Sequence, residues 1–373
     1  MPDRIFSDEE KAAIKRRMLK LLSVDGRRSI RDLASKLNVP QTTLNRLFRE
    51  TVKEQDIRFT PEIGIEELWR WEFVKYARTY NKKGILENVI EKLPELGFEE
   101  YLIFIKFIDG IPTDIEFSKA LEKHYIPQFA ARLHGEYDVV IYGIARSYDE
   151  INRFLNTFRE DISSLDKHYE IRSELLNIRT TFGFFPMQNN LVEKFQILDT
   201  YKHILLALNE DGRKEFSAIA KESKHGLPHI IYAYERLIDT GMLRRITYYE
   251  NKPNNVVTLI VQVTILNDKQ FLNSRSVWWL DMVRDYDKHI EYTFMCDIST
   301  PQGIIIFMNF VDGNSAEKFL NKLRTELHGS SIKPFFMTQI LLGNTGVRDF
   351  DAVYSRQYKF LESAKLIPKS YKK

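Results

Sequence analysis

The sequence predicts an α+β protein in which two winged helix-turn-helix domains alternate with two ferredoxin-like βαββαβ domains. Three observations support this prediction. Short helical periods separated by tight turns open the chain, strand-like runs follow, and near residue 190 the same order starts again. A chain of 373 residues is long enough for two to four compact domains.

The first helix-turn-helix domain is expected over residues 1–60. Apolar residues at helical spacing predict helices over 8–22, 30–37 and 41–53. Asp25-Gly26 breaks the first pattern, Ser29 is suited to cap the second helix, and Asn38-Val39-Pro40 turns the chain into the third. Three short helices with a tight turn between the last two are the skeleton of a helix-turn-helix.

A helical connector is expected over 61–100, and a ferredoxin-like domain over 101–190. Runs of β-branched and aromatic residues predict strands over 101–108, 126–133, 137–145 and 169–185. Helical periods fall between them, over 114–123 and 148–158. The order βαββαβ is that of an antiparallel sheet with helices on one face.

The second half of the chain repeats this organisation. Asp25-Gly26-Arg27 recurs as Asp211-Gly212-Arg213, 186 residues later, within a second winged helix-turn-helix domain expected over 191–253. A second ferredoxin-like domain follows over 254–360, with strands over 256–266, 290–298, 303–310 and 335–342 and helices around 276–285 and 316–327. Residues 361–373 form a basic tail.

Charge and composition narrow the possible functions. The net charge is only +3, but residues 1–60 carry 14 Lys and Arg against 9 Asp and Glu, and local positive charge attracts phosphate. The single cysteine, Cys296, excludes a disulfide framework and favours a reducing, cytoplasmic location. No apolar run reaches the ~18 residues of a membrane span. The eight histidines are scattered, so we expect no metal site and no cofactor.

Several stretches resemble the Lrp/AsnC (feast/famine) family of transcriptional regulators. Leu198-Asp199, Ile204-Leu205 and Asp211-Gly212-Arg213 look like that family's first helix and the turn after it, and Asp32-Leu33-Ala34 looks like part of its second helix. Gly135-Glu136-Tyr137-Asp138 is similar to the turn that opens the third strand of its effector domain. The chain departs from the family by carrying two units, and the second has Ser299-Thr300-Pro301-Gln302-Gly303 in place of that turn.

The resemblance and the local charge together predict a sequence-specific regulator that binds double-stranded DNA. A recognition helix needs polar and cationic side chains for base edges and phosphates. In the first copy the candidates are Arg27, Arg28, Arg31, Gln41, Thr42, Thr43, Asn45, Arg46 and Arg49. The second copy is less basic, and its candidates are His229, Tyr232 and Arg236 on the third helix and Arg244 and Arg245 on the expected wing.

The resemblance also implies that the effector-type domains self-associate and bind an amino acid or a similar metabolite. The candidate ligand residues are Arg132, His134, Gly135, Tyr137 and Asp138. Arg and Asp side chains could hold a carboxylate and an ammonium group, although Asp138 could equally cap a turn.

We expect no enzymatic activity, because the sequence contains no P-loop lysine, no G-x-S-x-G elbow and no H-E-x-x-H motif. Two alternatives remain open. Some proteins that resemble the family are siroheme decarboxylases with a pocket rich in histidine and arginine. An architectural chromatin protein would bind DNA with little sequence preference.

Overall fold

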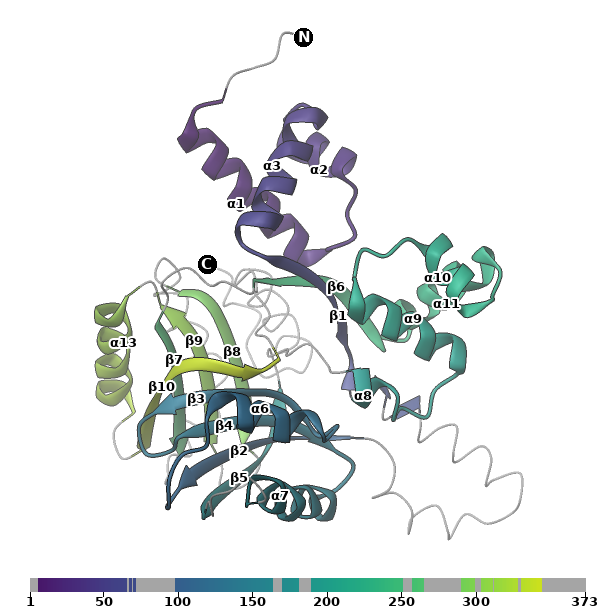
Figure 1. Ribbon diagram of the computed structural model, residues 1–373. Coiled ribbons are helices and arrows are strands. Elements are labelled where there is room, and N and C mark those ends of the chain that lie inside the picture. The colour runs from purple at the N-terminus through teal and green to yellow at the C-terminus, as the bar shows by residue number, and fades with distance from the viewer. Residues whose placement is uncertain are drawn as a thin grey trace, which may run out of the picture.

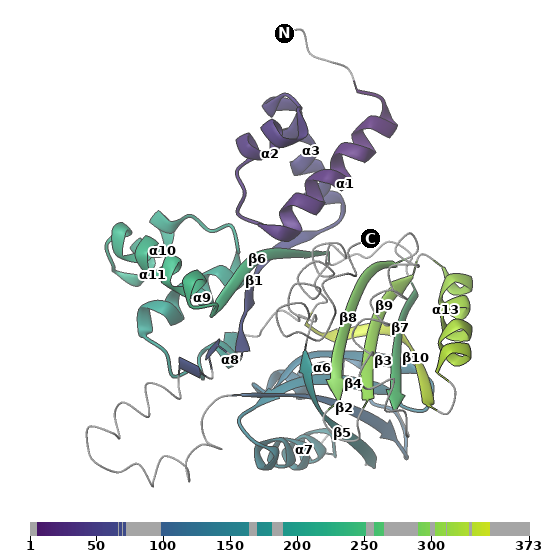
Figure 2. The same ribbon diagram turned by 180° about the vertical axis from the view of Figure 1, so that it is seen from behind.

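The computed structural model describes residues 6–71 except 66 and 69, then 98–163, 170–180, 189–250, 257–264, 290–298, 303–310, 312–327 and 330–343. Two small helical units lie beside a larger β-barrel, and a two-stranded sheet runs between the helical units (Figures 1 and 2). We call these units the first head (α1–α3) and the second head (α9–α11). No helix among the described residues is long and apolar enough to cross a membrane.

The first head consists of α1 (Asp8–Val24), α2 (Ile30–Leu37) and α3 (Gln41–Glu54), close to the predicted ranges. Local sequence explains the helix ends. Ser7 forms a capping box with Glu10, Ser29 accepts a hydrogen bond from the backbone of Asp32, and Asn38 ends α2 in the left-handed conformation at φ 55°. The core is made of the side chains on the inner stripe of each helix, among them Met18, Leu22, Leu33, Leu44 and Leu47.

The second head repeats the arrangement with α9 (Asp199–Glu210), α10 (Phe216–Ser223) and α11 (Leu227–Asp239), and the short helix α8 (Asn189–Val192) precedes it. Its core is again a set of inner-stripe residues, including Ile204, Leu208, Ile219, Ile230 and Leu237. The duplicated helix-turn-helix predicted from the sequence is therefore present in the fold.

The strand that follows each third helix joins the two heads. β1 (Ile57–Ile63) comes after α3, and β6 (Leu243–Glu250) comes after α11. The two strands pair antiparallel, from Ile57 opposite Glu250 to Ile63 opposite Leu243. The sequence predicted a wing strand near β6 but placed the end of β1 in a helical connector, and residues 72–97 of that connector lie outside the described residues.

The other eight strands of the described residues form one closed barrel in the order β10-β3-β4-β2-β5-β8-β9-β7. The first half contributes β2 (Glu99–Phe107), β3 (Pro127–His134), β4 (Val139–Ala145) and β5 (Ile171–Thr180). The second half contributes β7 (Val257–Thr264), β8 (Ile290–Ile298), β9 (Gly303–Phe310) and β10 (Ser331–Leu342). Numbered within its half, each set of four has the order 2-3-1-4, which is the ferredoxin-like order that the sequence predicted.

The two ferredoxin-like sheets are continuous within the chain. β5 pairs with β8, and β10 pairs with β3, and these two seams close the barrel. In the structure the two sheets therefore pair within one chain.

The barrel has a mainly apolar interior and helices on its outer face. Alternation along β2 sends Leu102 and Phe104 inward, and sends Ile103 and Ile105 outward against α6 (Asp114–Glu122) and α7 (Tyr148–Ser163). On the second half α13 (Gly313–Glu326) packs on β7 and β9. The helix expected around 276–285 and the tail over 361–373 lie outside the described residues.

Candidate nucleic-acid interface

The third helix of the first head presents a polar face to solvent. Leu44, Leu47 and Thr51 are buried and fix the orientation of α3. The predicted base-reading residues lie on the opposite side: Gln41, Thr42, Arg46 and Arg49 are exposed, and Thr43 and Asn45 are partly exposed. The Arg46 side chain is 64% exposed, and among the described residues its ion pair is a long one, 3.9 Å, to Glu50 of the next turn. The whole predicted set of α3 residues is thus accessible on one surface.

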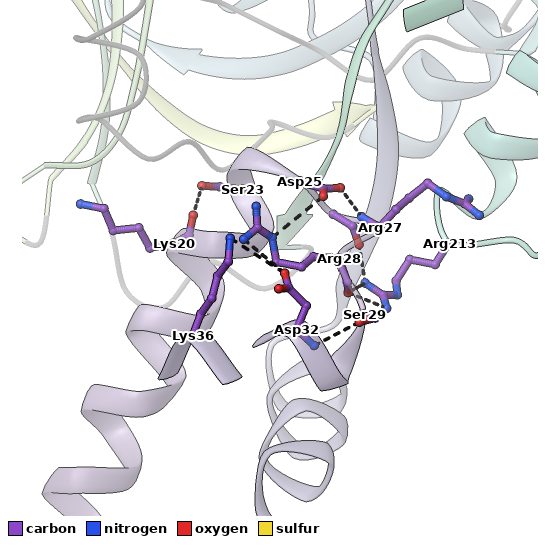
Figure 3. A network of polar contacts seen from close by, with 10 residues as sticks. Lys20, Ser23, Asp25, Arg27, Arg28, Ser29, Asp32, Lys36 and Arg213 are labelled. Atoms are coloured by element: carbon purple, nitrogen blue, oxygen red, sulfur yellow. Dashed lines mark hydrogen bonds and ion pairs between the residues drawn. The ribbon is translucent and has the colours of Figure 1, made fainter. Parts of the chain in front are cut away.

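The arginines before and on α2 differ in their surroundings. Arg31 is exposed. Arg28 is 16% exposed and lies between two carboxylates, 3.4 Å from Asp32 and 3.9 Å from Asp25 (Figure 3). Its charge is already balanced within the first head, which weakens the expectation that it contacts a phosphate.

Arg27 does not face solvent as expected but reaches across to the second head. Its guanidinium donates hydrogen bonds to the carbonyl oxygens of Gly212 (2.9 Å) and Lys214 (3.0 Å), and it lies over the ring of Phe216 at 4.3 Å. The guanidinium group of Arg27 therefore has its partners within the protein. The prediction that Arg27 contacts a DNA phosphate is therefore corrected: Arg27 joins the two heads.

Arg213, the counterpart of Arg27 in the repeat, makes the reciprocal contacts. It donates to the carbonyl oxygens of Gly26 and Arg28, and Figure 3 shows it lying against the turn that precedes α2. Its guanidinium lies 5.2 Å from the ring centres of both Phe48 and Phe59. Burial and the like charge of Arg27 lower the pKa of Arg213 below its ordinary value. We call this exchange of arginines the arginine clasp.

Each residue of the repeated Asp-Gly-Arg motif has a separate role in the clasp. The aspartate side chain accepts a hydrogen bond from the backbone N–H of the arginine, at 3.0 Å from Asp25 and 2.9 Å from Asp211. The glycine backbone donates to the two-stranded sheet, Gly26 to the oxygen of Ile246 and Gly212 to that of Phe59. The arginine then extends to the other head.

The third helix of the second head exposes a different surface. His229, Tyr232 and Arg236 are exposed, as expected for a recognition helix. They share the surface of α11 with apolar side chains, including Leu227 (42% exposed), Ile231 (37%) and Ile238 (38%). The face of α11 is therefore less cationic and more apolar than that of α3.

Both arginines of the expected wing, Arg244 and Arg245, form ion pairs within the protein. Arg245 is buried and its Nε donates to Glu62, a carboxylate only 1% exposed, across the β1–β6 ladder. Arg244 is exposed but has Glu62 at 3.9 Å and Glu67 at 3.7 Å. The prediction that Arg245 contacts DNA is corrected, because β6 pairs with β1 instead of forming a free wing.

The five predicted ligand residues do not converge on one site. Arg132 lies on the outer face of β3, donating to Asp114 at 2.7 Å and to the Pro112 carbonyl oxygen at 2.5 Å. His134, the last residue of β3, and Gly135, in the turn that follows, are both exposed, and Gly135 has φ 149°. Asp138 accepts from Lys106 and from the backbone of Phe107, each at 2.8 Å, so it anchors this turn.

Tyr137 belongs to a different environment inside the barrel. Its hydroxyl donates to Glu174 on β5, and Gln262 on β7 also donates to Glu174 at 3.3 Å. Burial, the hydrogen bond and the negative charge of Glu174 raise the pKa of Tyr137 above its ordinary value. The side-chain oxygen of Gln262 is buried and has no partner among the described residues.

Sequence reasoning missed Glu174 and Gln262 as members of this interior polar group. A signal for Gln262 was present, since it interrupts the apolar run of β7 at a position that alternation turns inward with Ile260. Its hydrogen bond to Glu174, 88 residues away in the sequence, depends on barrel closure, and no local sequence pattern indicates it.

Comparison with known proteins supports a DNA-binding fold at the amino end and a shared architecture over the whole chain. Residues 12–50 match the family described as winged helix-turn-helix DNA-binding. No curated protein sequence matches. The crystal structure of the siroheme decarboxylase NirDL is similar at a TM-score of 0.55 and 12% identity, covering 94% of this chain and 99% of that chain.

A second NirDL structure, in complex with an iron-uroporphyrin III analogue, gives a TM-score of 0.53 and 12% identity, covering 95% and 99% of the two chains. At 12% identity these two likenesses concern the fold alone. The solved neighbours also include the leucine response regulatory protein LrpA of Mycobacterium tuberculosis, at 14% identity and a TM-score of 0.31, covering 46% of this chain and 92% of that one.

Proposed function

We propose that this protein is a sequence-specific DNA-binding transcriptional regulator whose first head reads the target. The observation that carries the proposal is the open face of α3, where amide, hydroxyl and guanidinium groups stand together on a helix held by a buried stripe. Gln and Asn can pair with adenine, Arg with guanine, and Thr with a phosphate or a thymine methyl group. The winged helix-turn-helix match spans the same residues.

The residues proposed to contact DNA bases are Gln41, Thr42, Thr43, Asn45, Arg46 and Arg49. Arg31 is proposed to contact the adjoining DNA backbone. The second head contributes less to base reading because its third helix is more apolar, so His229, Tyr232, Arg236 and Arg244 are proposed as backbone or flanking contacts. Since the two heads differ and are held together in one chain, the proposed target is asymmetric.

The test is fluorescence anisotropy of the full chain with genomic duplexes over a range of salt concentrations, comparing wild type with the Arg46→Ala, Arg49→Ala variant. The variant should bind more weakly, and the slope of log affinity against log salt should become shallower by about one for each phosphate that is no longer bound. Arg159→Ala, an exposed arginine on α7, is the matched control and should leave both unchanged. Unchanged affinity and slope in the double variant would overturn the proposal, and binding without sequence preference would favour an architectural role.

An effector role for the barrel is the second part of the proposal. Glu174 and the unpartnered oxygen of Gln262 are acceptors inside the barrel, which suits the ammonium group of an amino acid or a similar metabolite. The same anisotropy series with added amino acids tests this role, because a bound effector should change the affinity for DNA. Association between chains through the barrel stays a further prediction.

A siroheme-decarboxylase-like activity is the second candidate, favoured by the fold likeness along almost the whole chain. Arg132, one of the candidate ligand residues, is already held by Asp114 and Pro112 on the outer face of the barrel. Addition of siroheme or haem to the protein distinguishes the two functions, since a Soret-type absorbance band from a bound tetrapyrrole would favour the decarboxylase.

A further inference from the structure

Two histidines of the second head converge on a single hydroxyl group. His225 lies in the turn before α11, and His229 lies in the first turn of that helix. Their Nε2 atoms are 3.3 Å and 3.4 Å from the Oγ1 atom of Thr200, near the start of α9. Both imidazoles are exposed, so ions in solution can reach them.

The separation of the two rings fits joint coordination of one ion. The ring centres are 5.1 Å apart, with 49° between the ring planes. Two imidazoles on a tetrahedral ion, each bound through nitrogen at about 2.1 Å, have ring centres roughly 5 Å apart. Both Nε2 atoms already lie near one point, the Oγ1 atom of Thr200.

We propose that His225 and His229 form a binding site for a divalent first-row transition ion of the zinc, nickel or copper type. Imidazole nitrogen suits these ions, whereas magnesium and calcium prefer oxygen. The described residues hold no group of three or more His, Cys, Asp or Glu side chains placed to bind a metal, so water supplies the remaining ligands. The site is therefore exchangeable and responds to the ion concentration in solution.

The site belongs to the second head alone. At the repeat spacing of 186 residues, the positions of Thr200, His225 and His229 are occupied in the first head by Ile14, Val39 and Thr43. An ion would tie the start of α11 to the turn before it, next to the start of α9. This inference revises the expectation, drawn from the scattered histidines, that the chain has no metal site.

Isothermal titration of the chelator-treated, untagged full chain with ZnCl2 and NiCl2 tests the site. We expect one ion per chain, and His225→Gln and His229→Gln should each weaken binding by at least about tenfold. His203→Gln is the matched control, because His203 is also exposed on the second head but contacts the Asp199 carbonyl oxygen instead. MgCl2 should give no binding.

Electron paramagnetic resonance with one equivalent of Cu²⁺ provides a second readout that does not depend on affinity. Coupling to two equivalent imidazole nitrogens is expected in the wild type and to one in either glutamine variant. Equal affinity of the wild type and both variants, or coupling to fewer than two nitrogens in the wild type, would overturn the proposal. Circular dichroism establishes that the variants are folded.

Discussion

Single residues of the two Asp-Gly-Arg turns determine how the heads meet. Gly26 and Gly212 lie so close to the β1–β6 sheet that a Cβ atom would stand 3.0 Å from the Ile246 oxygen at the first and 2.8 Å from the Phe59 carbonyl carbon at the second. The arginines can reach backbone carbonyls of the opposite head only because the turns approach this closely. In each three-residue motif the glycine thus allows the turn to approach the sheet closely, and the arginine forms the clasp.

Gly212→Ala should lower the free energy of unfolding by about 1–3 kcal/mol, because the added methyl group would meet backbone atoms of β1 that cannot move aside. Urea denaturation checks this value. Gly313→Ala is the control: a Cβ at Gly313 meets nothing within 4 Å, so that variant should be as stable as the wild type. Equal stability of the two variants would mean that the turn does not need a glycine.

The sequence showed that Asp-Gly-Arg recurs but could not separate the roles of the neighbouring arginines. Arg27, Arg28 and Arg31 all looked suited to phosphate contact, and only Arg31 is exposed in the structure. The partners of Arg27 lie on the other head, more than 180 residues along the chain. Local pattern carries no information about such a contact. On α3, where exposure follows from helical period, the predicted accessible residues are exposed or partly exposed.

Among the secondary-structure elements, the β1–β6 ladder contains a buried ion pair. Glu62 is 1% exposed and is paired with Arg245, which is 9% exposed, and Arg244 adds a second, more distant cation. Two charged groups out of contact with water are stable only as a pair, so the ladder is sensitive to the removal of either one.

Arg245→Met should therefore destabilise the protein by about 3–5 kcal/mol, since it removes the nearest cation from the buried Glu62 carboxylate and leaves Arg244 at 3.9 Å. The double variant Glu62→Leu, Arg245→Met removes both charges and should recover most of the stability. Thermal and urea unfolding of the two variants and the wild type gives the comparison. A double variant as unstable as the single one would show that the cost comes from packing rather than charge.

Helices were predicted more accurately than strand partners. The bounds of α2 and α3 fall within a residue or two of the expected ranges, because period, caps and turn residues are all local signals. Residues 57–63, which form β1, were assigned to the edge of a connector instead of a strand. The strand with which they pair, β6, lies in the second half of the chain.

For the whole molecule, the clasp, the β1–β6 ladder and the closed barrel join the two halves in three places. One chain then has the organisation of a dimer built from two unlike copies. If the chain binds DNA as proposed, a single chain should occupy one target. Sedimentation velocity with labelled duplex should show one chain per duplex, and the binding curve should have a Hill coefficient of about 1.

Two chains per duplex, or binding that rises with the square of protein concentration, would contradict this expectation. Arg27→Ala provides a matched comparison, because it weakens the connection between the heads without altering the exposed face of α3. That variant should keep the same stoichiometry and bind with lower affinity, since the second head is held less firmly by the remaining Arg213 contacts and the β1–β6 ladder.

The ferredoxin-like strand order of each half followed from the sequence, since βαββαβ with short connections leaves few topologies. Closure of the two sheets into one barrel did not follow from the sequence. It depends on β5 meeting β8 and β10 meeting β3, pairings between strands whose own patterns predict only an antiparallel sheet. The interior group around Tyr137 could not be anticipated for the same reason.

Barrel closure also limits how copies of this chain can assemble. Each of the eight described barrel strands has a neighbour on both sides, which leaves less unpaired backbone for a strand from another molecule than two open sheets would. The β5–β8 seam is short, with pairing only between Ile178–Thr180 and Cys296–Ile298. Growth by strand addition, the usual route from β-sheets to fibres, is therefore restricted at this barrel, which favours assembly through side chains on helices, turns or strand faces, where sequence can tune it.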